Sequence, residues 1–285
     1  MIHEYAIQPE VLIEWAKTQR TFKMFESSFG LGTTRIISTF PTQQARRLRS
    51  YLLRVQLKDI DGLAVKRYEA LVDMVTECLV VRKFDSKDIP LNEWGRLVIA
   101  ENQIKPFGII LSEKPLDLEK NLTPERVDVL DELWKHPGQI EVNRTNESIY
   151  TGLKGLLELS REKITIVDPY CYTSGAVKFI GFMLNELSKV IEVGLYPEVN
   201  LFFDEDKASA AHLKAEVLKL VNFSLCDTKL KVHGARNLHN RYVLTEHGGV
   251  TLGKGVSLQV DDTQVDEIIL LEKKIYLDKV TKYSE

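Results

Sequence analysis

The segment spanning residues 238–258 carries the side chains best suited to chemistry on a phosphate group. If it forms a strand, His239 and Arg241 lie on one face, because side chains alternate with a period of two. Farther along, Gly253 and Gly255 allow a backbone or a phosphate to approach closely. An imidazole can attack phosphorus while a guanidinium neutralises the non-bridging oxygens. The segment therefore predicts a phosphate-directed site.

The elements that must position these residues alternate between helix and strand. The strands expected in the second half of the chain are 163–167, 199–203, 230–232, a hairpin over 241–252, and 268–271. Strands separated by helices favour an α/β fold with a largely parallel sheet. Ligands of such sheets tend to bind beyond the carboxyl ends of the strands, where Asp168, Asp204 and His239 fall.

A helix signal divides the chain into two domains. Residues 121–137 begin with Thr123 as a helix N-cap and Pro124 in the first turn, and a Pro-Gly pair ends them. We place the domain boundary after this helix. The sequence thus predicts a separate α/β or α+β domain of unknown type over residues 1–138 and a second domain over residues 139–285.

The histidine segment resembles the signature of the phospholipase D superfamily. That signature has a histidine, any residue, a lysine, four residues, an aspartate, six residues, then Gly-Ser. His239, Arg241, Glu246 and Gly253 fall at this spacing. The departures from the signature are Arg241 for lysine, Glu246 for aspartate, Lys254 for serine and Val256 for asparagine.

A divergent branch of that superfamily resembles the chain more closely. It comprises the C-terminal domain of proteins with microtubule-interacting-and-transport domains, together with bacterial stand-alone relatives. The branch reads Asp-Pro-Tyr, His-Asp-Arg, a glycine turn and Gly-Arg-Gly-Leu. The corresponding motifs follow in the same order here: Asp168-Pro169-Tyr170, His239-Asn240-Arg241, Gly248-Gly249 and Gly253-Lys254-Gly255-Val256. The resemblance covers residues 139–285 and implies a phospholipase D-like mixed sheet flanked by helices.

The resemblance also implies roles for individual residues. Catalytic roles fall to His239, Arg241 and Glu246. Phosphate-binding roles fall to Gly253, Lys254, Gly255, Ser257, Asp168 and Tyr170. Because superfamily catalysis uses two histidines, a single motif per chain implies a homodimer. A lone histidine in a hairpin can equally be structural, but the glycines and the Asp-Pro-Tyr motif favour a phosphate-facing site.

A basic stretch offers a second candidate surface. Residues 27–58 contain no acidic residue, although the net charge of the chain is −3. The candidate contacts to a nucleic-acid backbone are Arg35, Arg46, Arg47, Arg49 and Arg54. The same arginines can instead form solvated helix faces, and the sequence leaves both interpretations open.

These features support several functions. One is a dimeric phosphodiesterase, most plausibly a nuclease, and a second is an inactive module that binds nucleic acid. A third is an inactive module that binds a protein partner or phospholipid headgroups. The bacterial relatives suggest a component of an anti-phage defence system with partner proteins from its operon.

Composition narrows the class of protein. With 285 residues and 44% hydrophobic residues, the chain can bury a core, which argues against disorder. We expect neither a signal peptide nor a membrane span, because no apolar run is long enough. Three widely spaced cysteines favour a reducing, cytoplasmic setting. No spacing of metal ligands and no dinucleotide or phosphate-loop motif is present, so we expect no metal and no cofactor.

Overall fold

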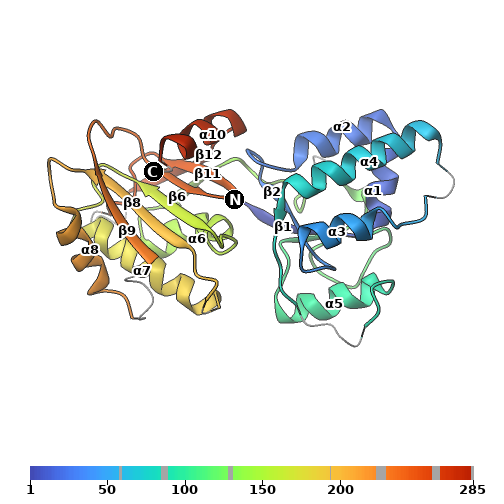
Figure 1. Cartoon of the computed structure of the whole chain (residues 1–285), viewed down its shortest axis with the longest axis horizontal. Helices are drawn as coiled ribbons and strands as arrows, with labels where there is room; N and C mark the ends of the chain where they lie inside the picture. The colour runs from blue at the N-terminus through green and yellow to red at the C-terminus, as the bar shows by residue number, and fades with distance from the viewer. Residues whose placement is uncertain are drawn as a thin grey trace. The chain divides into compact units, whose positions relative to one another are not determined.

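The computed structural model describes residues 1–57, 60–84, 89–127, 131–192, 194–222, 229–258 and 264–283. The chain forms two compact units, Ile2–His136 and Pro137–Glu285 (Figure 1). Each unit has its own sheet, and helices flank both sheets. The α/β class predicted from the sequence is therefore confirmed for both units.

The N-terminal unit is built on a five-stranded sheet with the order β3-β2-β1-β4-β5. Its strands, all paired in parallel, are β1 (His3–Ile7), β2 (Arg35–Ser38), β3 (Leu79–Val80), β4 (Ile109–Leu111) and β5 (Asn121–Leu122). Its helices are α1 (Pro9–Ala16), α2 (Gln19–Ser28), α3 (Ala45–Leu52), α4 (Gly62–Glu77) and α5 (Trp94–Ile104). Figure 1 shows α5 on the opposite side of β1 and β2 from α2 and α4, so helices cover both faces.

Aromatic side chains fill the core on both faces of this sheet. Trp15 and Trp134 pack with Tyr5 on one face, whereas Trp94 packs with Phe40 on the other. Each of these tryptophans is at most 4% exposed, and together they are all the tryptophans of the chain. Burial of these large rings supplies much of the hydrophobic stabilisation of the unit.

The C-terminal unit contains a seven-stranded sheet with the order β6-β12-β11-β10-β7-β8-β9. Its strands are β6 (Gln139–Asn143), β7 (Lys163–Val167), β8 (Glu198–Asp204), β9 (Leu230–Ala235), β10 (Tyr242–Thr245), β11 (Gly248–Leu252) and β12 (Val265–Leu270). Its helices are α6 (Asn146–Leu157), α7 (Ser174–Val190), α8 (Ala210–Leu218) and α10 (Lys273–Lys282).

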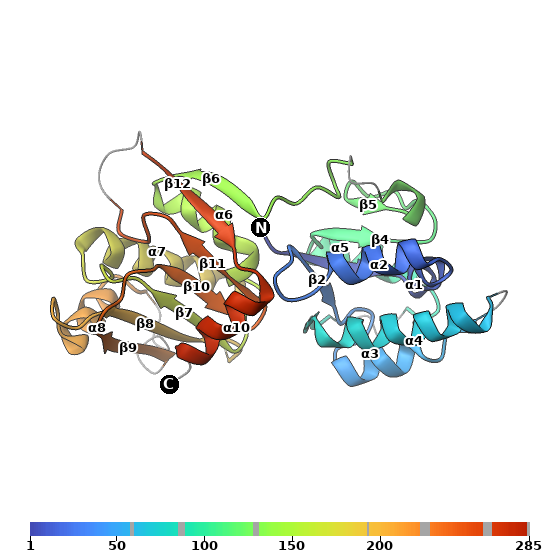
Figure 2. The same cartoon turned by 90° about the horizontal axis from the view of Figure 1, so that it is seen from above.

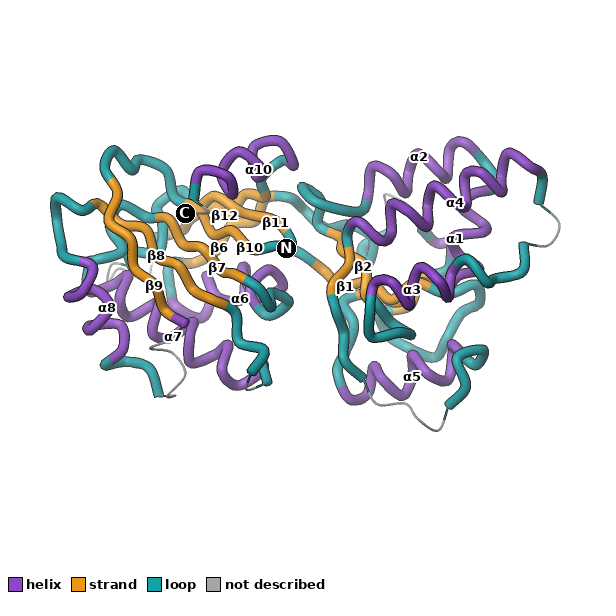
Figure 3. Tube along the Cα trace, in the orientation of Figure 1, coloured by secondary structure: helices purple, strands orange, loops and turns teal. Residues whose placement is uncertain are grey.

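Strand direction in this sheet is mixed. β7, β8 and β9 lie side by side (Figure 3). Their pairings are parallel, whereas the other four pairings of the sheet are antiparallel. The prediction of a mixed sheet is confirmed, and that of a largely parallel sheet is wrong for this unit. The β10–β11 hairpin contributes to this difference, because a tight turn makes its two strands antiparallel, and β10 is also antiparallel to β7.

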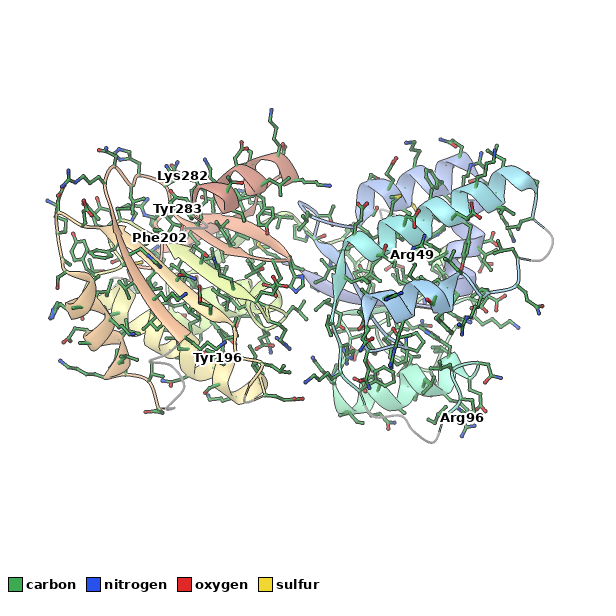
Figure 4. All side chains as sticks on the ribbon, viewed as in Figure 1. Arg49, Arg96, Tyr196, Phe202, Lys282 and Tyr283 are labelled. Atoms are coloured by element: carbon green, nitrogen blue, oxygen red, sulfur yellow. The ribbon has the colours of Figure 1, made fainter. Side chains whose placement is uncertain are left out.

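The two faces of the C-terminal sheet differ in their cover. Helices α6, α7 and α8 lie on one face and α10 on the other (Figure 2). Tyr283, directly after α10, packs against Phe202 of β8 with ring centroids 5.2 Å apart (Figure 4). Because β10 and β7 are neighbours at the centre of the sheet, residues at their facing ends are brought together.

The predicted helix over residues 121–137 is not found in the described parts of this segment, residues 121–127 and 131–137. Asn121 and Leu122 pair as β5 with β4, and only a 3-10 turn (Pro124–Arg126) follows Thr123. Residues 128–130 of this segment lie outside the described residues. Pairing of β5 and burial of Trp134 in the core outweigh the local helix signals.

Candidate functional site

Asp168 marks the carboxyl end of β7, and its carboxylate is 1% exposed. Oδ1 accepts a hydrogen bond from the backbone N–H of Tyr170, and Oδ2 accepts one from Val256, both at 2.8 Å. Burial raises the pKa of Asp168, while these two N–H groups and the charges of Arg241 and Arg144 oppose the rise. The side chain thus joins the end of β7 to the glycine loop that follows β11.

Arg241 faces Asp168 from the position just before the neighbouring strand. It directly precedes β10, in which Tyr242 is paired with Val167 of β7. Its Nε lies 3.7 Å from Asp168 Oδ1, and its Nη1 donates a hydrogen bond of 3.1 Å to Gly253 O. Nε is buried without a hydrogen-bond acceptor, and the side chain is 24% exposed. A hydrogen bond to Gly253 O therefore anchors the guanidinium, while its Nε lacks a hydrogen-bond acceptor.

The glycine loop, residues 253–257, packs directly against this pair. Gly255 has a φ of +74°, and a Cβ there would lie 2.1 Å from Asp168 Oδ2 and 2.3 Å from Arg241 Cδ. Only glycine satisfies both the backbone conformation and the close approach. The loop brings the exposed Lys254 to the same part of the molecule.

A second buried pair also holds the loop. Arg144 Nη1 lies 2.7 Å from Asp266 Oδ2, and the Arg144 guanidinium also donates to the carbonyl oxygens of Gly255 and Ser257. Asp266 accepts from the N–H of Lys254 at 2.9 Å. Sequence reasoning missed Arg144 and Asp266, because no local pattern links two residues that are 122 positions apart.

Tyr170 completes the surroundings of Arg241. Its ring is 45% exposed, and the Arg241 guanidinium carbon lies 5.5 Å from the ring centroid. Ser257 instead faces inward, with its Oγ 2.5 Å from Thr173 Oγ1. Cys171, next to Tyr170, is fully buried, and burial raises the pKa of its thiol well above the usual value. Tyr170 and Lys254 are thus two exposed side chains in the surroundings of the Asp168–Arg241 pair.

His239 lies near this region but outside a strand. We expected it to share a strand face with Arg241, yet β10 begins only at Tyr242. The strand starts there because its neighbours end opposite it, β7 at Val167 and β11 at Leu252. The His239 side chain is exposed, and no hydrogen bond to it is found among the described residues.

Glu246 is not part of this arrangement. It lies at the other end of β10, in the turn to β11. Its carboxylate accepts from Ser160 Oγ at 2.7 Å and from the N–H groups of Arg161 and Glu162. Burial raises its pKa, but nearby positive charge and these donors lower it more, so the net pKa is below the usual value. Glu246 therefore anchors the turn before β7, and its position does not support the predicted catalytic role.

The basic stretch of the N-terminal unit separates into three environments. Arg35 donates to Trp134 O and lies over the Trp134 ring at 4.2 Å. Arg49, labelled in Figure 4, pairs with Asp73 of α4 at 2.9 Å. The remaining arginines are exposed and line surface cavities; they are Arg46, Arg47 and Arg54. The five predicted contacts thus do not form one continuous surface.

Comparisons with known proteins do not place the chain in a family. No family model and no curated protein matches the chain. Among the solved structures that resemble part of it is TrmBL2, an archaeal chromatin protein whose structure shows a novel mode of DNA binding. The match has a TM-score of 0.33 and 11% identity, and it covers 55% of this chain and 54% of the other. At this TM-score the similarity carries no argument about fold or function.

Two further features of the described ranges concern membranes and metal ions. No helix in them is both long and apolar enough to cross a membrane. Within the same ranges, no group of three or more His, Cys, Asp or Glu side chains is arranged to hold a metal ion.

Proposed function

We propose that the C-terminal unit binds the backbone phosphate of a nucleic-acid strand at the Arg241 corner, defined as Asp168, Tyr170, Arg241 and the glycine loop. The observation that carries the proposal is the guanidinium of Arg241, which Gly253 O anchors and which stays partly exposed beside an exposed tyrosine. An arginine held in this way is preorganised for an anion, which reduces the entropy lost on binding.

The neighbours of Arg241 fit a nucleic-acid strand better than an isolated phosphate. A guanidinium can hold a phosphate through two parallel hydrogen bonds. The exposed Tyr170 ring offers a stacking surface for a base, and Lys254 adds a positive charge. Together they combine the backbone and base contacts that single-strand binding requires.

The same corner supports assignment of the unit to the phospholipase D-like branch. The motifs Asp168-Pro169-Tyr170, His239-Asn240-Arg241 and Gly253-Lys254-Gly255-Val256 are distant in sequence. Hydrogen bonds and an ion pair join all three, through Asp168, Arg241, Gly253 and Val256. Their meeting at one place is what the resemblance requires.

Binding without cleavage is the function that the geometry favours. In the described part of the chain, no side chain is hydrogen-bonded to His239 to orient it, and Glu246 is at the far end of β10. A two-histidine mechanism would need His239 of a second copy within hydrogen-bond reach of the leaving oxygen.

Filter binding of labelled single-stranded DNA and RNA, measured over a salt series, tests the proposal. We expect Arg241→Lys and Tyr170→Ala each to weaken binding by about tenfold, since a bidentate contact or a stacked base is lost. The matched control is Arg236→Lys, because Arg236 is exposed and already paired with Glu205 at 2.7 Å. Equal affinities for wild type and both variants would contradict the proposal.

The same samples test the alternative functions, strand cleavage and binding to lipid headgroups. His239→Ala should leave binding unchanged, and the bound strand should stay intact in wild type. Strand cleavage that disappears in His239→Ala would establish the nuclease instead. Binding to anionic lipid vesicles but to no oligonucleotide would establish a headgroup-binding module.

A further inference from the structure

The strand order of the N-terminal unit creates a point where ligands commonly bind. From β1 the chain builds outward through β2 to β3, and then continues on the other side of β1 with β4 and β5. In open parallel sheets, ligands bind outside the carboxyl ends of the strands, where the order reverses in this way. Gln8 follows β1 at that place, and its Oε1 accepts a 2.9 Å hydrogen bond from the N–H of Glu113, beyond β4.

Two cavities open at this edge of the sheet. One, of about 680 Å³, begins at residues 41–44 after β2, and the other, of about 560 Å³, begins at Gln8 after β1. Both are lined by Tyr51 and Arg54, so they are two parts of one groove along α3. We call it the α3 groove. Each part is within the size range of small-molecule sites.

Positive charge is concentrated in the larger part of the groove. Arg46, Arg47 and Arg54 line it, whereas Leu48 and Leu52 of α3 are buried in the core on the other side of the helix. No acidic side chain is found among its described lining residues, and no ion pair of these three arginines is found in the described chain. Clustered like charges cost stability unless an anion compensates them, so their placement in a groove indicates an anionic ligand.

The groove also offers contacts for an uncharged, planar part of a ligand. Phe84 and Leu91 line its larger part, and the Tyr51 ring lies where the two parts meet. Burial raises the pKa of Tyr51 to about 12, so its hydroxyl remains a hydrogen-bond donor at neutral pH. Glu10 lies in the smaller part, where a carboxylate can accept hydrogen bonds from sugar hydroxyls.

We propose that the α3 groove binds a nucleoside phosphate. The phosphate groups contact Arg46, Arg47 and Arg54, and the nucleoside extends past Tyr51 toward Glu10. Arginine side chains serve here in place of a glycine-rich phosphate loop, which the sequence lacks.

Isothermal titration calorimetry of the full chain tests this proposal with ATP, GTP and AMP. Pyrophosphate and adenosine serve as the two halves of the ligand. At least one nucleotide should bind at least about tenfold more tightly than either half, because each half fills only one part of the groove. Arg47→Gln and Arg54→Gln should each lower the nucleotide affinity by about tenfold. Both side chains are exposed, and circular dichroism will verify that the variants are folded.

Arg49→Gln is the matched control, since Arg49 lies on the same helix but pairs with Asp73 outside the groove. It should bind nucleotide as wild type does, and so should Arg241→Lys, which separates this site from the Arg241 corner. No binding of any nucleotide would overturn the proposal. Pyrophosphate binding as tightly as a nucleotide would overturn its nucleoside part. Oligonucleotide binding that is lost in Arg47→Gln, without nucleotide binding, would assign the groove to a nucleic-acid strand.

Discussion

Two arginine–aspartate pairs hold the same glycine loop. In the closed pair the charged groups are in hydrogen-bonding contact, and in the open pair they are not. Arg144 and Asp266 meet at 2.7 Å with side chains 3% and 2% exposed, whereas Arg241 and Asp168 are 3.7 Å apart and Arg241 is 24% exposed. The closed pair directs its donors to Asp266 and to loop carbonyls. The open pair leaves Nε of Arg241 without an acceptor. The difference separates a structural arginine from one that is available to a ligand.

The closed pair should show the largest effect on stability. Arg144→Ala leaves Asp266 as an uncompensated buried charge, and we expect a loss of about 3 to 5 kcal/mol in the free energy of unfolding. Hydrogen exchange followed by mass spectrometry on peptides from residues 137–285 measures it. Protection equal to that of wild type would show that the loop does not depend on this pair.

A substitution in the glycine loop between the two pairs should lower the free energy of unfolding nearly as much. Gly255→Ala adds a Cβ that would lie 2.1 Å from Asp168 Oδ2, at a φ of +74°. We expect a loss of about 2 to 4 kcal/mol, because backbone strain and overpacking act together. Gly138→Ala is the control in the same unit, since a Cβ there meets no atom within 4 Å. Thermal unfolding of the two variants should differ clearly.

The open pair should contribute less to stability than the closed one. Arg241→Ala removes one hydrogen bond and a long ion pair, so we expect a loss of about 1 kcal/mol in the free energy of unfolding. The same variant should bind oligonucleotides poorly. A loss of stability as large as that of Arg144→Ala would show that Arg241 is a structural residue, and would contradict the distinction between the two pairs.

Titration of Asp168 should have the smallest effect on the free energy of unfolding. Burial raises the pKa of its folded-state carboxyl above the unfolded value, so ionisation destabilises the fold at neutral pH. This cost fades as the pH falls through the folded-state pKa. Carboxyl ¹³C NMR should give a midpoint above the ordinary value for an aspartate, and Arg241→Ala should raise it further. A midpoint below the ordinary value would contradict the assignment of burial as the dominant cause.

Much of the C-terminal fold follows from local sequence pattern. The segment 163–167, Lys-Ile-Thr-Ile-Val, predicts a strand and forms β7, because β-branched residues, which favour strands, predominate in it. The strand β6 was missed because four of its five residues are polar or only partly buried, which hides the pattern. Thr123 and Pro124 predicted a long helix, but tertiary pairing of β5 decided the outcome.

The candidate site was predictable only in part. Asp168, Arg241 and Gly255 belong to short motifs, and the structure brings them together. Among the basic residues, Arg49 and Arg46 look alike in sequence, yet only Arg49 meets an acid, on a helix packed beside its own. Whether an arginine is matched depends on tertiary partners, which no local spacing reveals.

The distribution of tryptophan has a practical consequence. All three indoles lie in residues 2–136, whereas residues 137–285 contain none. Tryptophan fluorescence, excited selectively, therefore reports on one unit alone, and Trp94, which lines the smaller part of the α3 groove, places a native emitter at that site. Tyrosine absorbance includes the other unit as well. Spectroscopy of the unlabelled chain can thus follow melting of the two halves separately.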